Sequence, residues 1–318
     1  MSKARHYKND FSAERLLPGH KTCAGCAAPP IVRAVLEASP DPVVVCSATG
    51  CLEVTTTVYP NTSWNVPFIH SAFENAAATI AGVETAYEVL RDKVDKKLEK
   101  NILGYTLHPR INFIAFGGDG GTYDIGLQSL SGALERGHNF LYVCYDNEGY
   151  MNTGGQRSGA TPRGAVTSTT PAGKYSDGKI QYRKNLMEIC AAHNISYCAQ
   201  ASISDLNDLK SKVKKALAKP GAKFINVLSP CPTVWKFMPG DVIKVARLAV
   251  ETRFWPVYEI ENGVYNISYK PKEHVPVEEF LKTQKRFAHL FQDDYGKKTI
   301  IAIQKRIDLE WNALLKRA

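Results

Sequence analysis

The stretch Ile111-Asn-Phe-Ile-Ala-Phe-Gly-Gly-Asp-Gly-Gly121 decides the fold of this chain. It begins with a short apolar run typical of a buried strand, and the glycines that follow end the strand abruptly. A helical pattern occupies Tyr123 to Glu135, and a second apolar run follows at Asn139–Tyr145. A strand, a crossover helix and another strand are the repeating unit of a parallel sheet. Apolar residues in the predicted helix lie at Ile125, Leu127, Leu130 and Leu134.

The same alternation of strands and helices extends over most of the chain. We therefore predict an α/β fold, with a parallel twisted sheet and helices on both of its faces. The region from Asn147 to about Ile180 is too long for an ordinary connection, so we expect it to be functional. The expected strands lie near 43–46, 111–116, 140–145, 196–200 and 223–228, and the expected helices near 73–99, 122–136, 183–193, 205–219 and 240–250.

Oxygen-bearing side chains follow two neighbouring strands of this sheet. Asp119 lies in the glycine turn after the first strand, and Asn147 follows the next strand, 28 residues later. The carboxyl ends of parallel strands meet at one edge, where open α/β sheets bind ligands. Magnesium prefers oxygen ligands and shares its coordination shell with phosphates, so the pair predicts a magnesium ion held against a diphosphate. The alternative is an ordinary glycine turn in a βαβ unit.

Composition narrows the class of protein. With 318 residues, 44% of them hydrophobic, the chain can bury one large α/β domain or two smaller ones. No run is long enough to cross a bilayer and the first residues lack a secretory apolar core, so we expect a cytoplasmic protein without a membrane association. The net charge of +9 is spread through helices, which indicates a solvated basic surface and no nucleic-acid partner. A positive surface can also attract an acidic electron carrier.

The eight cysteines divide into two groups of four. Without an export signal we do not expect disulfides. One group lies in strand or helix patterns and is predicted to be buried as small apolar residues: Cys46, Cys144, Cys190 and Cys198. The other group lies in glycine- or proline-rich breaks: Cys23, Cys26, Cys51 and Cys231.

The cysteines in breaks have the pattern of one metal centre. Cys23 and Cys26 form a C-x-x-C loop, in which Gly25 lets the backbone curl around a common point. Cys51 and Cys231 each follow a predicted strand, so both are expected at the ligand-binding edge of the sheet. Four thiolates suit either a tetrahedral zinc ion or an iron–sulfur cluster, and their spacing does not separate the two.

Six motifs in one order identify a family. The similarity extends from about residue 18 to the C-terminus, where it includes Lys270-Pro-Lys-Glu-His274 and Pro276-Val-Glu-Glu-Phe280. Together these motifs resemble the β subunit of the pyruvate:ferredoxin (2-oxoacid:ferredoxin) oxidoreductases. They are Cys23-x-x-Cys26, Ala48-Thr-Gly-Cys-Leu-Glu53, Phe73-Glu-Asn-Ala-Ala77, Gly118-Asp-Gly-Gly-Thr-Tyr-Asp-Ile-Gly126, Asp146-Asn-Glu-Gly-Tyr-Met-Asn-Thr-Gly-Gly155 and Ser229-Pro-Cys-Pro232.

This resemblance implies the diphosphate-binding half of a thiamine diphosphate fold and one [4Fe–4S] cluster close to it. Asp119 and Asn147 would bind Mg²⁺, with the main-chain carbonyl of Gly149 as a further ligand. The cluster ligands would be Cys23, Cys26, Cys51 and Cys231. The cofactor-binding residues would be Thr49, Gly50, Glu53, His70, Gly118, Asp119, Gly120, Gly121, Asn147, Asn152 and Thr153.

Asn152 and Glu53 are the catalytic candidates, and His70 and Glu74 are weaker candidates for the cofactor site. Each also has a purely structural interpretation: Asn152 as the cap of a turn, Glu53 as a surface acid at a helix start, and His70 as a core histidine. The chain departs from the family pattern at Ala27, where relatives often carry glycine; a methyl group there is compatible with a cluster.

The resemblance also implies a reaction and partners. The leading expectation is the catalytic β subunit of a 2-oxoacid:ferredoxin oxidoreductase that converts pyruvate to acetyl-CoA and CO₂. The activating glutamate would come from an α subunit, and electrons would pass through γ and ferredoxin-like δ subunits, or fusions of them, to ferredoxin. Oxalate, without coenzyme A, and phenylglyoxylate or other 2-oxoacids are alternative substrates. A non-catalytic iron–sulfur electron-transfer subunit and a zinc-stabilised non-oxidative decarboxylase are alternatives of other classes.

We expect three parts along the chain: an N-terminal cluster-binding segment at residues 1–30, the thiamine diphosphate-binding α/β domain at 31–251, and a C-terminal extension at 252–318. The last part ends in an apolar helical pattern that includes Ile300, Ile303 and Ile307, so it should pack on the domain or on a partner subunit.

Overall fold

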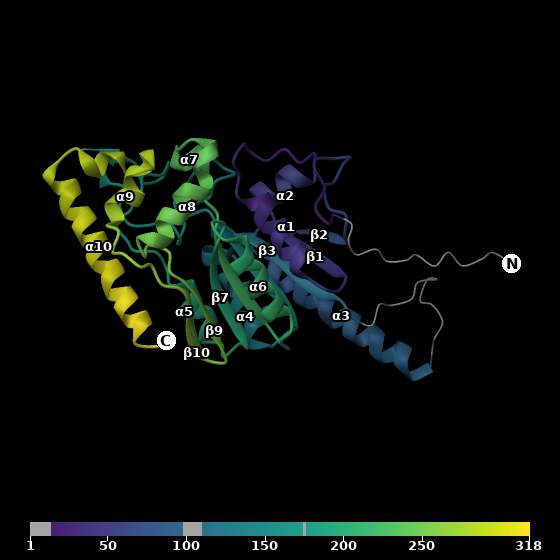
Figure 1. Cartoon of the computed structure of the whole chain (residues 1–318). Coiled ribbons are helices and arrows are strands. Elements are labelled where there is room, and N and C mark those ends of the chain that lie inside the picture. The colour runs from purple at the N-terminus through teal and green to yellow at the C-terminus, as the bar shows by residue number, and fades with distance from the viewer. Residues whose placement is uncertain (1–13, 98–109, 174–175) are drawn as a thin grey trace.

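An eight-stranded sheet forms the centre of the protein (Figure 1). The computed structural model describes residues 14–97, 110–173 and 176–318, so part of the predicted N-terminal segment, 1–13, and the end of the first predicted helix, 98–99, lie outside the described residues. The strands of the sheet are β1 (Val43–Ala48), β2 (Phe68–Ser71), β3 (Asn112–Gly118), β4 (Leu141–Asp146), β7 (Tyr197–Ser202), β8 (Lys223–Leu228), β9 (Val257–Glu261) and β10 (Val264–Tyr269).

The sheet is mostly parallel, as predicted. Its order is β10-β9-β7-β8-β4-β3-β1-β2, and the six strands from β7 to β2 pair in parallel. All five predicted strands are confirmed as β1, β3, β4, β7 and β8. Three strands of this sheet were not predicted: β2, which has only four residues, and the antiparallel pair β9–β10. A separate two-stranded sheet, β5 (Ala172–Gly173) and β6 (Ser176–Asp177), was not predicted either. The turn Asn262-Gly263, with φ of 50° and 81°, is a tight hairpin signal that would have found this pair.

Both faces of the sheet are covered, because successive strand residues point to opposite sides. On β4, Leu141, Val143 and Tyr145 pack into one apolar core, while Tyr142 and Cys144 pack into the other. The first core is shared with helices α1 (Ala28–Ala38), α6 (Leu206–Leu217) and α8 (Val242–Glu251). The second is shared with α3 (Ala76–Lys97), α4 (Leu127–Glu135) and α5 (Leu186–Ala191). Cys46, Cys144, Cys190 and Cys198 are buried, as predicted.

The helix after β3 differs from its predicted register. The chain first forms a π-helical turn, Gly120–Asp124, and only then enters α4. This wider turn rotates the residues that follow, because its hydrogen bonds span five residues. Ile125 is consequently 55% exposed, so its prediction as a core-facing residue was wrong, whereas Leu130 and Leu134 are buried.

The segment predicted as a C-terminal extension takes part in the main fold. It contributes β9 and β10 to one edge of the sheet, and α9 (Val277–Lys282) and α10 (Asp294–Leu315) pack beside that edge (Figure 1). Ile300, Ile303 and Ile307 of α10 are buried, in agreement with the predicted apolar face.

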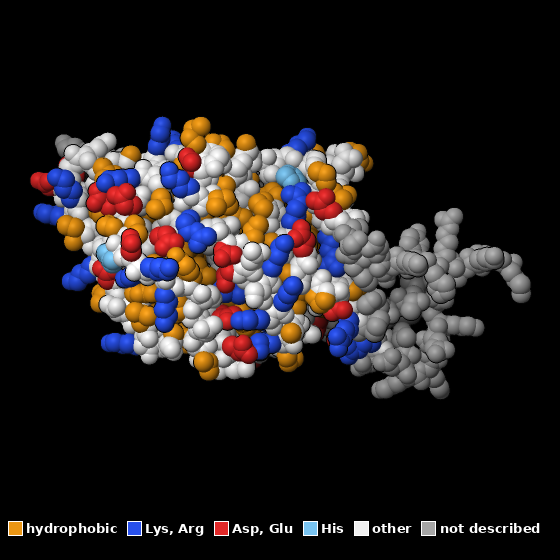
Figure 2. Space-filling model, viewed as in Figure 1, with side chains coloured by type: hydrophobic (Ala, Val, Ile, Leu, Met, Phe, Trp, Pro, Cys, Tyr) orange, Lys and Arg blue, Asp and Glu red, His pale blue; other side chains and the backbone are white. Residues whose placement is uncertain are grey.

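The surface gives a further constraint. In the face shown in Figure 2, Lys and Arg side chains are interspersed with Asp and Glu over the whole described area. Within the described ranges, no helix is both long and apolar enough to cross a membrane.

Two short helices, α2 (Cys51–Thr56) and α7 (Pro232–Trp235), lie at the same end of the molecule (Figure 1), where the carboxyl ends of β1 and β8 lead into them.

Candidate functional site

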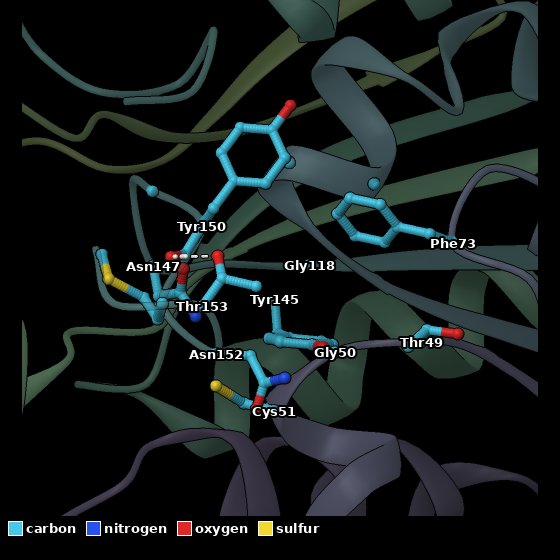
Figure 3. Close-up of a pocket in the computed structure, with 14 residues that line it drawn as sticks. Thr49, Gly50, Cys51, Phe73, Gly118, Tyr145, Asn147, Tyr150, Asn152 and Thr153 are labelled. Carbon is cyan, nitrogen blue, oxygen red and sulfur yellow. Dashed lines mark hydrogen bonds between the residues drawn. The ribbon is translucent and has the colours of Figure 1, made fainter. Parts of the chain in front are cut away.

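A pocket of about 610 Å³ opens at the carboxyl ends of β1, β3 and β4. Three segments form most of its wall: Thr49–Cys51, the glycines around Asp119, and Asn147–Thr153 (Figure 3). The predicted residues that line it are Thr49, Gly50, Gly118, Gly120, Gly121, Asn147, Gly149, Asn152 and Thr153. Phe73, Tyr145, Tyr150 and Met151 also line it and were not predicted. No periodicity or spacing marks these four residues as pocket-lining.

The glycines around Asp119 have different reasons for being glycine. A Cβ on Gly120 would lie 2.6 Å from Cε1 of Tyr150, and one on Gly126 would lie 1.9 Å from the carbonyl oxygen of Gly121. At both positions, neighbouring protein atoms leave no room for a side chain. A Cβ on Gly118 would meet only the ring of Tyr145, at 3.4 Å, which is ordinary contact. Gly118 therefore leaves space in the pocket without being required by the packing.

Oxygen atoms converge beneath this pocket. One terminal atom of the Asn147 amide lies 2.7 Å from Oδ1 of Asp119 and 2.9 Å from the carbonyl oxygen of Gly149. If that atom is nitrogen, it donates to both; if it is oxygen, three oxygens meet without a donor between them. Cis oxygen ligands of an octahedral Mg²⁺ lie about 3 Å apart, since each bond is about 2.1 Å. The three oxygens therefore fit a magnesium ion.

The electrostatics of Asp119 favour a cation at this point. Its side chain is fully buried and accepts a hydrogen bond from Ser158 Oγ. Burial, with the negative charge of Asp146 in addition, raises the pKa of Asp119 well above its usual range. Within the described ranges Asp119 forms no ion pair with Lys, Arg or His. A divalent cation would supply the missing countercharge and keep the carboxylate ionised.

The long loop after β4 packs beneath this site. Ser158, Ala160 and Thr161 are fully buried, and Thr161 Oγ1 donates to the carbonyl of Glu148 at 2.7 Å. The buried Lys179 donates to the carbonyls of residues 158, 159 and 161. The loop thus contacts Asp119 through Ser158, a role that only the unusual length of the loop indicated.

The four cysteines from the glycine- and proline-rich breaks line a second pocket, of about 730 Å³. Burial, with the negative charge that ionised Cys231 and Cys23 would carry in addition, raises the pKa of the Cys26 thiol to about 11 and that of Cys51 to about 12. The thiols therefore influence one another across the pocket. In the described part of the chain, no three His, Cys, Asp or Glu side chains lie close enough to share a single metal ion. Cysteines spread around a cavity in this way suit a polynuclear cluster better than one zinc ion, whose ligands all lie about 2.3 Å from a common centre.

The two pockets share a wall. Cys51, Asn147 and Asn152 line both pockets, together with Tyr145 and Met151. Asn152 and Cys51 lie on one side of the first pocket, opposite the ring of Phe73 (Figure 3). The side-chain amide of Asn152 makes no hydrogen bond to any other described residue, so it is free to bind a ligand. Thr153, in contrast, uses its hydroxyl on Gln156.

Thr49, His70 and Glu53 lie side by side next to the first pocket, with a hydrogen bond between Thr49 and His70 only. Thr49 Oγ1 lies 2.6 Å from His70 Nε2 and donates to the carbonyl of Ser71 at 3.1 Å, so the hydroxyl points away from the pocket (Figure 3). His70 Nδ1 lies 3.6 Å from Glu53 Oε1. Of these three residues, Thr49 lines the pocket. Glu53 and His70 are not among the described lining residues. Glu53 is buried, which excludes a plain surface acid.

Comparisons with known proteins agree with this geometry. Residues 48–227 match the family "Thiamine pyrophosphate enzyme, C-terminal TPP binding domain". This range contains both the glycine turn and Asn147. The chain is 51% identical to pyruvate synthase subunit PorB of Thermotoga maritima, over 93% of this chain and 90% of that protein. It is 52% identical to the subunit of the same name from Methanocaldococcus jannaschii, over 93% of this chain and 94% of that protein.

A relative with a different substrate in its name lies further away. Ketoisovalerate oxidoreductase subunit VorB of Pyrococcus abyssi is 41% identical, over 96% of this chain and 94% of that protein. Among solved structures, 2-oxoglutarate:ferredoxin oxidoreductase from Magnetococcus marinus has a TM-score of 0.57 at 20% identity, covering 78% of this chain and 84% of that chain, which shows a shared fold. The chain therefore belongs to the β subunits of the thiamine diphosphate-dependent 2-oxoacid:ferredoxin oxidoreductases, the family of pyruvate synthase subunit PorB.

Proposed function

We propose that this chain is the catalytic β subunit of a pyruvate synthase, which oxidatively decarboxylates pyruvate to acetyl-CoA and CO₂ and passes the electrons to ferredoxin. One observation carries this proposal: the pocket beside Asp119 and the pocket lined by four cysteines share a wall at Cys51 and Asn152. The cofactor would stabilise a carbanion of the substrate, and the cluster would accept the electrons of that carbanion one at a time. The two groups must therefore bind close together.

Asp119, Asn147 and the carbonyl of Gly149 would hold Mg²⁺ in this chain. Their oxygens converge as a divalent cation requires, and Gly118 leaves the space for a diphosphate to approach the backbone. Bound there, thiamine diphosphate supplies an electron sink at its thiazolium ring. Gly120, Gly121 and Thr153 would surround the diphosphate, and Asn152 would donate a hydrogen bond toward the reacting atoms from its free amide.

Thr49 and Gly50 would contact the cofactor from the β1 side of the pocket. Since the Thr49 hydroxyl is engaged with His70, its methyl group and backbone are the surfaces that face the pocket. Glu53 and His70 would then act through Thr49 by fixing its rotamer.

Cys23, Cys26, Cys51 and Cys231 would ligate a [4Fe–4S] cluster. Burial raises the pKa of the Cys26, Cys51 and Cys231 thiols, and cluster binding would displace their protons, since thiolates are the ligands. The cluster would accept electrons at the shared wall and pass them on.

The pocket lacks one group that thiamine chemistry requires. No Asp or Glu is among its described lining residues, so none is in position to act on the pyrimidine ring. We infer that an α subunit supplies that carboxylate and completes the site. Further γ and ferredoxin-like δ subunits, or fusions of them, would carry electrons to ferredoxin, and coenzyme A would take the acyl group.

The substrate is inferred from the relatives. Pyruvate synthase subunits reach 52% identity, against 41% for a ketoisovalerate enzyme subunit. Oxalate and phenylglyoxylate remain the alternatives within the family, and oxalate would need no coenzyme A. A non-catalytic electron-transfer subunit is disfavoured by the convergence of Asp119, Asn147 and Gly149 beside the pocket, and a zinc-stabilised decarboxylase by the spread of the cysteines around their pocket.

The test is a substrate screen of the complex, expressed with its partner subunits and purified anaerobically. We expect pyruvate-dependent ferredoxin reduction that requires coenzyme A, together with bound thiamine diphosphate and four irons per copy of this chain beyond those of the ferredoxin-like subunit. Turnover of oxalate without coenzyme A would replace the substrate assignment. Absence of thiamine diphosphate would favour the electron-transfer subunit, and zinc in place of iron and sulfide would favour the decarboxylase.

A further inference from the structure

Arg286 is a buried cation between the metal-binding loop and the cysteine pocket. It lies in the 3₁₀ segment Lys285–Phe291, and its side chain is 3% exposed. Nη2 donates to Oε2 of Glu148 at 2.5 Å, and Nε donates to Oε1 of Gln284 at 2.8 Å. The guanidinium carbon lies 3.7 Å from the centre of the Trp235 ring. Arg286 is 138 residues from Glu148 in the sequence, so no local motif reveals the pair.

Trp235 connects the two loops directly. It is the last residue of α7, and its backbone N–H donates to the carbonyl of Cys231 at 2.9 Å. Its indole Nε1 donates to the carbonyl of Asn147, also at 2.9 Å, and the side chain is fully buried. One face of the indole is covered by Arg286. The loop that carries Cys231 and the loop that carries Asn147 are thus joined through a single side chain.

Glu148 determines how the metal-binding loop turns. It stands between Asn147 and Gly149 and has a φ of 64°, in the left-handed region that a residue with a side chain seldom adopts. This conformation costs of order 1 kcal/mol or more and persists only when surrounding contacts hold it. Those contacts are the ion pairs of its carboxylate with Arg286 and Arg183 and the hydrogen bond from its backbone N–H to Asp146.

We propose that Arg286 and Trp235 form a positioning unit that holds the metal-binding loop and the Cys231 loop in one fixed relation. This inference rests on the proposed function, since it assumes that Asn147 and Gly149 hold Mg²⁺. Neither residue touches the cofactor pocket; both act through Glu148 and through the Asn147 carbonyl. The C-terminal segment, by way of Arg286, thereby takes part in building the site.

The unit also places one positive charge beside both loops. Arg286 faces the Glu148 carboxylate and stacks on Trp235, whose backbone N–H donates to the carbonyl of Cys231. Removing that charge would leave Glu148 paired with Arg183 alone and would make the neighbourhood of Cys231 more negative. A more negative environment makes a cluster harder to reduce.

The experiment uses the complex expressed with its partner subunits and three variants of this chain. Arg286→Met removes the charge and retains the bulk, Arg286→Lys retains the charge and loses the planar stacking, and Glu148→Gln with Arg286→Met removes both charges. Arg253→Met is the matched control, because Arg253 covers the ring of Trp311 at 5.3 Å, in contact with neither loop. The measurements are Mg²⁺ affinity with saturating thiamine diphosphate by calorimetry, the midpoint potential of the cluster by electron paramagnetic resonance, and the thermal midpoint.

We expect Arg286→Met to weaken Mg²⁺ binding about 10- to 100-fold, the usual effect of losing an outer-shell partner, and to lower the cluster potential. Arg286→Lys should weaken Mg²⁺ binding less and leave the potential nearly unchanged. If Arg286→Met does not assemble, the double variant replaces it in the Mg²⁺ measurement; its cluster potential should match the wild type, because removing both charges of the pair leaves the net charge unchanged. Arg253→Met should lower only the thermal midpoint.

Unchanged Mg²⁺ affinity in an assembled variant would overturn the positioning role. An unchanged cluster potential together with weakened Mg²⁺ binding would overturn the link to the Cys231 loop. If the wild-type complex itself binds no Mg²⁺ with thiamine diphosphate, the proposed function has failed, which is a different result from a normal wild type with unaffected variants.

Discussion

The amide of Asn147 lies 2.7 Å from Oδ1 of Asp119, although the two residues belong to different strand ends and are 28 positions apart. The carbonyl of Gly149 completes the group at 2.9 Å from the same amide atom. Two buried acceptors at this spacing need a donor or a cation between them, which the Asn147 nitrogen or a bound ion can supply. By ending β3 and β4 side by side, the parallel sheet brings these groups together.

Asp119→Asn should abolish Mg²⁺-dependent binding of thiamine diphosphate and hence turnover, because the amide keeps the shape but lacks the charge that a divalent cation needs. The four-iron spectrum should persist, since Asp119 does not line the cysteine pocket. Calorimetry and absorption spectroscopy check both. Asp205→Asn, a change in the cap of α6, is the control and should bind cofactor normally. Retained turnover in Asp119→Asn would refute the metal role.

Cys231→Ser should remove the cluster or convert it to a smaller one, because serine supplies a poor ligand in place of a thiolate. Electron paramagnetic resonance of the reduced complex measures the loss. Cys190→Ala is the matched control: Cys190 is buried in the second apolar core and should leave the signal intact. An undiminished four-iron signal in Cys231→Ser would mean that another residue ligates the cluster.

Asn152→Ala should lower kcat about 100-fold, the typical effect of removing a hydrogen-bond donor that acts on developing charge. Binding of thiamine diphosphate should change little, because the Asn152 amide is not among the convergent oxygens. Steady-state kinetics and calorimetry separate the two effects. Asn312→Ala, at an exposed position on α10, is the control. A loss of binding with unchanged kcat would instead make Asn152 a cofactor-binding residue only.

Gly118→Ala should leave the thermal midpoint nearly unchanged and weaken thiamine diphosphate binding about tenfold or more. The new methyl group meets the protein only at 3.4 Å but fills pocket space, and such overpacking costs about 1–3 kcal/mol. Gly126→Ala is the comparison, because its methyl group would lie 1.9 Å from the Gly121 carbonyl and should destabilise the fold. If Gly118→Ala binds normally, the diphosphate lies elsewhere in the pocket.

Lys223 predicts a pH dependence of stability. The residue is 2% exposed, and burial lowers its pKa to about 8, against the opposing effect of Glu84. The unfolded chain therefore binds more protons than the folded chain between about pH 8 and pH 10.5, and the contribution of Lys223 to the free energy of unfolding rises across that window. Relative to Lys223→Met, the free energy of unfolding of the wild type should rise by about 2–3 kcal/mol between about pH 8 and pH 10.5. Thermal midpoints of the two complexes at pH 8 and pH 10 measure this difference, and a constant difference would contradict it.

The predictable part of the site consists of residues that are close in sequence to strand ends. Asp119, Asn147 and the two cysteines at strand ends, Cys51 and Cys231, follow from the rule that parallel strands deliver their carboxyl ends to one edge. The hairpin β9–β10 was missed although its turn carries a usable signal at Asn262-Gly263. Phe73 and Tyr150 could not be predicted, because aromatic residues line pockets and cores with the same local pattern.

By itself the sequence determined the parallel α/β sheet and the family, and it predicted which side chains gather at the site, because periodicity, glycine turns and cysteine spacing are local properties of the chain. Only the tertiary structure decided that the two pockets share Cys51 and Asn152, that the Thr49 hydroxyl turns away toward His70, and that Arg286 holds Glu148 from 138 residues away. These relations depend on how distant segments pack in a nearly void-free interior, where each contact is set by all its neighbours and by no single stretch of sequence.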